Sequence, residues 1–201
     1  MTLPGLLLAA SGMVLAQDAA PPEIDPAYTT EIAAIMDDAA VRTGMAHIVS
    51  IEPQSRRDLI ELTEIPAPPF GEQARAERFA EMLREAGLTD VTIDAEGNAV
   101  GRRPGRSGDR VVAYAAHLDT VFPAETDVTV RFDDEKMYAP GIGDNTRGLV
   151  TVLGVLRAMQ HAGIETDADL DSSIRMATFL GLPSGPIGRE LRRRDRPPRH
   201  R

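Results

Sequence analysis

The chain has 201 residues, of which 42% are hydrophobic and 26% are charged. This composition is typical of a globular protein with a substantial core rather than of a disordered chain. The net charge of −9 excludes a general nucleic-acid binder, because phosphate recognition requires a basic face. The chain has no cysteine, so any bound metal ion would be held by histidine, aspartate or glutamate.

The N-terminus has the pattern of an export signal. Residues 3–16 are largely apolar and end in Val14-Leu15-Ala16, which is typical of a signal peptide cleaved after Ala16. The stretch is too short to cross a bilayer comfortably, and the alternative is a poorly ordered apolar N-terminus. We expect a signal peptide over residues 1–16, a linker over residues 17–30, a periplasmic or secreted protein, and no membrane contact after cleavage.

The first half of the chain predicts three helices. Apolar residues recur at helical spacing from about residue 24 to residue 47, with interruptions at Gly44 and at about residues 49–53. A second helix is expected from about Gln54 to the proline-rich stretch at residues 65–69. A third is expected over residues 71–86, because the glycine that follows is a typical helix stop.

The pattern then changes to that of strands. Residues 91–94 and 99–101 flank the turn Glu96-Gly97-Asn98 and predict a hairpin. The continuous apolar run at residues 111–116 predicts a strand buried on both faces.

The second half continues the alternation of strands and helices. Residues 128–132 and 137–138 predict a second hairpin, and residues 147–161 predict the most strongly amphipathic helix of the chain. A further strand is expected at residues 174–180. This alternation predicts an α/β fold, with a sheet flanked by helices.

The C-terminal tail differs from the rest in charge. Seven of the 22 basic residues are arginines within residues 189–201, whereas the rest of the chain carries 15 basic and 29 acidic side chains. Arginine, proline and glycine make up most of residues 181–201, which therefore contribute little to a core. Such runs arise when GC-rich DNA is translated out of frame, so we expect an aberrant tail produced by a frameshift or premature end. The downstream nucleotide sequence in all frames would test this.

The first candidate site segment is His117-Leu118-Asp119, directly after the expected buried strand. A neutral imidazole is a good zinc ligand and needs a partner on its other nitrogen to fix its tautomer and orientation. Asp119 is close enough to be that partner, and α/β folds place ligands at the carboxyl ends of strands. In isolation His-x-Asp is a weak motif, for which a turn or capping pair at a strand end is the favoured explanation.

The second candidate segment is Gly141-Ile142-Gly143-Asp144, immediately before the amphipathic helix. The glycines allow a close approach to a site, and a carboxylate at position 144 has two oxygens that can bridge two metal ions. The alternative is a helix N-cap, in which the Asp144 carboxylate would accept backbone amides without any metal.

Together, the two segments resemble the co-catalytic zinc peptidase superfamily that includes glutamate carboxypeptidases, tripeptidases and acetylornithine deacetylases. Residues 65–72 resemble the loop before the first long helix of that family, and residues 94–98 resemble its Asp-x-x-Gly-Asn hairpin. The resemblance covers about residues 59–164 in order and is nearest to the tripeptidase-like branch. It implies the helix-flanked mixed sheet of a zinc-peptidase-like catalytic domain over residues 31–180, incomplete at the C-terminus.

The resemblance also implies roles for three residues. His117 would bind one metal ion, Asp119 would orient its imidazole as a catalytic-site residue, and Asp144 would bridge two zinc ions. The implied activity is that of a zinc-dependent exopeptidase or amidohydrolase acting on a peptide or an N-acyl amino acid.

The chain departs from the family pattern after position 144. The family needs an adjacent pair of glutamates, a later carboxylate and a C-terminal histidine, but Glu165 and Glu190 are the only glutamates that follow Asp144. We also expect the dimerisation domain of the family to be absent. We therefore expect incomplete zinc occupancy, little or no hydrolysis, and poor cover for the strand at residues 111–116. The alternatives are a non-catalytic binding or regulatory module that keeps the fold without metal, and a single-metal protein that uses His117, Asp144 and Glu165.

Overall fold

The computed structural model describes residues 24–174. The expected signal peptide, the aberrant tail and all but the first residue of the strand expected at residues 174–180 lie outside this range. The chain divides into two compact units, of which one ends at Ile35 and the other begins at Met36. Helix α1 (Pro26–Asp37) buries none of its residues and begins within the segment that we expected to be a linker.

The second unit contains four α-helices within the described residues. They are α2 (Ala39–Ser50), α3 (Glu52–Thr63), α4 (Gln73–Glu85) and α5 (Arg147–Ala162). The Asp38 carboxylate accepts hydrogen bonds from the first amides of α2, which separates this helix from α1. The interruption predicted at Gly44 is wrong: Gly44 is buried inside α2, where a Cβ atom would lie 3.5 Å from the Ala158 carbonyl oxygen of α5. Packing against α5 outweighs the low helix propensity of glycine.

The described strands form two sheets, a larger one with the order β1-β2-β6-β3 and a smaller one that pairs β4 with β5. The strands are β1 (Thr89–Ile93), β2 (Ala99–Arg103), β3 (Val111–Tyr114), β4 (Arg131–Asp133), β5 (Lys136–Tyr138) and β6 (Asp169–Ile174). In the larger sheet, β2 is antiparallel to both β1 and β6, whereas β3 and β6 are parallel. The predicted α/β fold with a helix-flanked mixed sheet is confirmed.

Strand β6 is one that the sequence pattern did not predict, although it lies between β2 and β3. Its polar composition conceals it, since Asp169, Asp171 and two serines alternate with few apolar residues. The carboxylates of Asp169 and Asp171 face Arg102 of β2, with N–O distances of 2.6 and 3.7 Å. Charge pairing across neighbouring strands therefore takes the place of the hydrophobic alternation that marks most strands.

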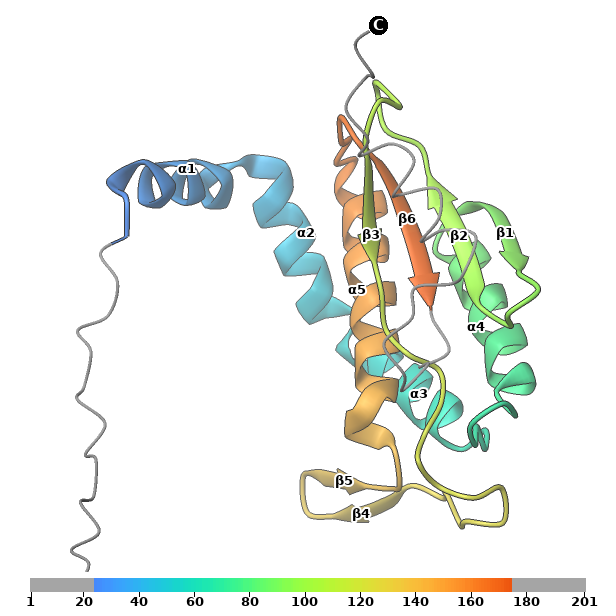
Figure 1. Cartoon of the computed structure of the whole chain (residues 1–201). Helices are drawn as coiled ribbons and strands as arrows, with labels where there is room; N and C mark the ends of the chain where they lie inside the picture. Colours follow the sequence, from blue (N-terminus) through green and yellow to red (C-terminus); the bar gives the residue numbers. More distant parts are fainter. Residues whose placement is uncertain (1–23, 175–201) are drawn as a thin grey trace, which may run out of the picture. The chain divides into compact units, whose positions relative to one another are not determined.

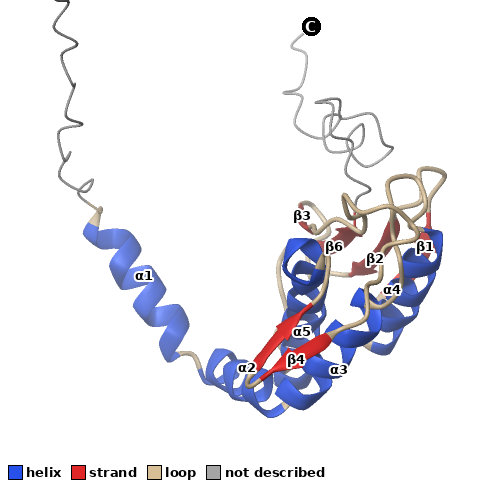
Figure 2. Ribbon diagram, turned by 90° about the horizontal axis from the view of Figure 1, so that it is seen from below, coloured by secondary structure: helices blue, strands red, loops and turns tan. Residues whose placement is uncertain are grey.

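Helices cover one face of the larger sheet, where α4 packs against β1 and β2 beside α5 (Figures 1 and 2). The core on this side includes the fully buried residues Leu62, Phe79, Leu83, Leu149 and Leu153. The prediction that residues 111–116 are buried on both faces is wrong for β3, because Val112 is 41% exposed and Tyr114 36%. Most of β3 therefore keeps an exposed surface in the described part of the chain. None of the described helices is long and apolar enough to cross a membrane.

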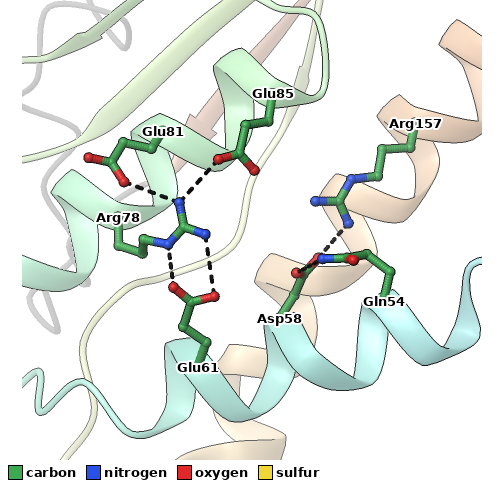
Figure 3. Close-up of polar contacts among 7 residues, drawn as sticks. All are labelled: Gln54, Asp58, Glu61, Arg78, Glu81, Glu85 and Arg157. Atoms are coloured by element: carbon green, nitrogen blue, oxygen red, sulfur yellow. Dashed lines mark hydrogen bonds and ion pairs between the residues drawn. The ribbon is translucent and has the colours of Figure 1, made fainter.

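Two ion-pair networks join the helices, and they differ in burial (Figure 3). In the first, Arg157 of α5 donates to the carboxylate of Asp58 on α3, which is only 2% exposed. The second surrounds Arg78 of α4 near the surface, where its guanidinium meets the carboxylates of Glu61, Glu81 and Glu85. The buried pair therefore links α3 to α5, and the surface cluster links α3 to α4.

A pair of stacked histidines predicts a pH dependence of stability. The rings of His47 on α2 and His161 on α5 lie 3.9 Å apart and 6° from parallel. Desolvation and the nearby His161 lower the pKa of His47. The unfolded chain therefore binds the proton more readily, and stability falls as the pH drops through about 6.5. We expect the thermal midpoint, measured by circular dichroism, to fall more steeply between about pH 7.5 and 5.5 in the parent than in His47→Gln. Parallel curves would contradict this.

Candidate metal centre

His117 lies just beyond the end of β3, at the edge of the larger sheet. Its neighbours Ala116 and Leu118 are 7% and 0% exposed and belong to the hydrophobic core. Because side chains alternate along an extended backbone, His117 points away from that core, and its side chain is 31% exposed. The apolar neighbours thus anchor the segment while the imidazole stays accessible.

Two contacts fix the backbone on either side of Asp119. Arg75 of α4, which is 1% exposed, donates from Nη1 to the Leu118 carbonyl at 2.8 Å. Its guanidinium also donates to the carbonyl of Ile65, from Nε at 3.1 Å and from Nη2 at 2.5 Å. On the other side, the amide of Thr120 donates to the Ala67 carbonyl at 2.8 Å. The loop that resembles the family's N-terminal loop therefore supports the His117 segment directly.

Arg75 is a residue that the sequence analysis missed. Burial lowers its pKa to about 10, and the carboxylates of Asp119 and Glu72 act in the opposite direction, so the guanidinium remains charged at neutral pH. The sequence did contain a sign that Arg75 is buried. In the helix predicted over residues 71–86, Arg75 lies one turn before Phe79, on the apolar face of the helix. An arginine in that position points to buried carbonyl partners.

Asp144 lies in the short turn η1 (Ile142–Thr146) that leads into α5, and its own backbone is extended, with φ −130° and ψ 92°. The turn begins at Gly141, whose φ of +78° is left-handed, and a Cβ atom here would lie 2.5 Å from Cγ2 of Thr120. Glycine therefore allows the two candidate segments to approach each other closely. Helix α5 has no side-chain hydrogen bond at its N-cap, so the alternative in which Asp144 serves as a helix cap does not apply.

The structure brings His117 and Asp144 together. Nε2 of His117 lies 2.9 Å from Oδ1 of Asp144, whose side chain is 91% exposed. On the other side of the ring, Nδ1 lies 3.0 Å from the carbonyl oxygen of Asp119 and 3.2 Å from its carboxylate oxygen Oδ1. Asp119 thus holds one ring nitrogen, and the other nitrogen faces the carboxylate of Asp144.

The described residues supply no third ligand. Among them, no three histidine, aspartate or glutamate side chains are grouped so that they could hold a metal ion. Glu165 follows the C-terminus of the 16-residue helix α5, whereas Asp144 precedes its N-terminus, and a helix of that length spans about 24 Å. The single-metal alternative that combined Glu165 with His117 and Asp144 is therefore wrong.

The donor atoms fit part of a zinc site. Imidazole nitrogen and carboxylate oxygen are ligands that zinc prefers, each at about 2.0–2.2 Å. Two donor atoms 2.9 Å apart can therefore belong to the same ion. A catalytic zinc ion takes about three protein ligands, and residues 24–174 bring two candidate ligands together.

Comparisons with known proteins found one matching family model and several similar solved structures. Residues 113–172 match the sequence profile of "Peptidase family M20/M25/M40". A comparison with curated protein sequences finds no match. Among solved structures, the chain is similar to the di-peptidase Dug1p from Saccharomyces cerevisiae, with a TM-score of 0.58 and 19% identity over 75% of this chain. It is also similar to human carnosine dipeptidase 1, with a TM-score of 0.56 and 16% identity over 73%.

A third similar structure is a tripeptidase from Staphylococcus aureus, with a TM-score of 0.53 and 23% identity over 62% of this chain. The chain spans only 36% of the length of each of these three proteins. At these identities the structural likeness establishes the fold.

Proposed function

Because residues 113–172 match the M20/M25/M40 peptidase family and the described fold is that of solved dipeptidases and a tripeptidase, we propose that this chain is part of a zinc-dependent exopeptidase or amidohydrolase. Its substrate would be a dipeptide, a tripeptide or an N-acyl amino acid. The observation that carries the proposal is the 2.9 Å approach of His117 Nε2 to Asp144 Oδ1, two side chains that come from separate segments.

Each residue of the site would have one role. His117 and Asp144 bind metal, and Asp119 orients the imidazole through Nδ1. Bound zinc ions would polarise the scissile carbonyl and activate water. The exposed side of the imidazole and the Asp144 carboxylate would face the substrate, while Arg75 fixes the backbone behind them.

We further propose that the 201-residue polypeptide by itself hydrolyses no peptide at a useful rate. The described residues bring together two candidate metal ligands, and loss of a general base alone costs roughly 10²–10⁴ in rate. Purified polypeptide incubated with zinc and with dipeptides, tripeptides or N-acyl amino acids is expected to release no product. Turnover that a chelator abolishes would contradict this part of the proposal.

Zinc titration of the polypeptide tests the site itself. His117→Ala and Asp144→Ala are each expected to weaken zinc binding at least about tenfold, and Asp119→Ala about 10–100-fold. His161→Ala is the matched control, because it removes an imidazole that stacks on His47 outside the candidate site, and its zinc affinity should equal that of the parent. If His117→Ala bound zinc as tightly as the parent, the alternative of a binding or regulatory module that needs no metal would be favoured.

The proposal includes export to the periplasm or the medium, on the strength of the apolar residues 3–16. N-terminal sequencing of protein recovered from that compartment is expected to start at Gln17, and an intact Met1 would argue against cleavage.

A further inference from the structure

A pocket of about 300 Å³ lies between helices α2, α3 and α5 and strand β5. Neither His117 nor Asp144 contributes to its lining. Its wall is mainly apolar and includes the side chains of Ile48, Leu59, Met137, Val150 and Val155. The volume is at the lower end of the range for small-molecule sites, which are typically apolar with a few well-placed polar groups.

Gly154 keeps part of this space open. It is buried in the middle of α5 and lines the pocket, yet a Cβ atom added to it would have no atom within 4 Å. Glycine lowers the stability of a helix interior relative to alanine, so packing within the described residues gives no reason for a glycine here. The absent side chain instead leaves room for a ligand beside the helix.

The polar groups at the pocket favour an anion. Arg56 and Arg147 line it together with one acidic residue, Glu52, which pairs with Arg56 at 3.2 Å. Arg147 is exposed at the first position of α5, and no carboxylate in residues 24–174 forms an ion pair with it. A positive side chain at a helix N-terminus opposes the helix dipole, so an anion beside Arg147 would relieve that repulsion. This excess of positive charge occurs in a chain with a net charge of −9.

We propose that this pocket binds a small monocarboxylate that carries an aliphatic or aromatic group. The apolar group would fill the space beside Gly154, in contact with Val150 and Leu59. The carboxylate would accept hydrogen bonds from the guanidinium of Arg147, which can hold it with two donors at once. The site is separate from the candidate metal centre and needs no metal ion.

The probe for this site is 4-phenylbutyrate, titrated into the ¹⁵N-labelled polypeptide and followed by NMR. We expect saturable shifts of the amides around Val150 and Thr151, with a Kd on the order of 1 mM for a ligand of this size. The uncharged counterpart 4-phenyl-1-butanol should bind at least about tenfold more weakly, because it cannot form the charge-assisted hydrogen bonds.

Two variants and one control complete the test. Gly154→Leu fills the open space and should abolish binding, and Arg147→Gln should weaken it about tenfold. Arg131→Gln removes an exposed arginine that does not line the pocket and should leave binding unchanged. If Gly154→Leu does not fold, ligand binding by Arg147→Gln and Gly154→Ala tests the proposal instead. The alanine variant should also have a higher thermal midpoint than the parent. Binding unaffected by Arg147→Gln, equal binding of the alcohol, or no saturable shift overturns the proposal.

Discussion

The Arg75→Met variant is expected to lose about 3 kcal/mol of unfolding free energy. The methionine would keep much of the apolar stem of this buried side chain but would remove its donors. The buried carbonyl of Leu118 and the partly buried carbonyl of Ile65, which accept those donors now, would lose them. Urea denaturation followed by circular dichroism at 222 nm would measure the loss, since the chain contains no tryptophan.

Arg84→Met is the matched control for that measurement. Arg84 lies on the same helix and donates to the Val91 carbonyl at 3.0 Å, but it is exposed. Its removal should cost less than about 1 kcal/mol, because water can take over the hydrogen bond. If Arg75→Met were as stable as Arg84→Met, the buried guanidinium would not be holding the His117 segment in the way described. Zinc affinity should fall along with stability in Arg75→Met, through the displaced Leu118 backbone.

Asp58→Ala is also expected to lower the free energy of unfolding by about 3 kcal/mol, because it leaves a buried positive charge without its partner. Arg157 has a side chain only 15% exposed and donates to the Asp58 carboxylate, which also accepts from Gln54 at 2.6 Å (Figure 3). Combining Asp58→Leu with Arg157→Met should recover much of the stability, since well-packed apolar residues often replace a buried ion pair at little cost. Chemical denaturation of the single and double variants would show this.

The control for Asp58 lies one turn along the same helix. Glu61→Ala removes a carboxylate that is 46% exposed, and Arg78 keeps two other glutamates (Figure 3). Its cost should be below about 1 kcal/mol, as for other surface ion pairs. A Glu61→Ala variant that lost as much stability as Asp58→Ala would show that burial does not distinguish the two networks.

The elements that the sequence predicted well are those with a strong local pattern. Helix α5 and the hairpin of β1 and β2 agree with the prediction because amphipathic spacing and a glycine turn are encoded within a few residues. Strand β6 was missed because charge pairs with Arg102 place it in the sheet. Double burial of β3 was wrongly expected because an apolar run shows that a strand can be buried, but cover depends on other parts of the fold.

The family model that matches residues 113–172 supports the resemblance to a peptidase family, and that resemblance linked the two candidate segments, which the residue patterns alone did not. His-x-Asp and a carboxylate before a helix were each ambiguous alone. The approach of His117 to Asp144 depends on Gly141 and on the loop that contains Ala67. Nothing in the local sequence at either place indicates which distant segment it contacts. Arg75 was missed because the carbonyls it satisfies are 10 and 43 positions away.

The position of β6 in the sheet has a consequence for how the protein folds during its synthesis on the ribosome. It is the last described strand to be synthesised, yet the hairpin of β1 and β2 and strand β3 meet only through it. Until residue 174 has emerged, β2 and β3 have no shared neighbour, and the nascent chain holds helices without a joined sheet. Such long-range pairing slows folding and prolongs the time during which strand edges are open to other chains. A chaperone that shields the emerging polypeptide should therefore raise the yield of folded protein.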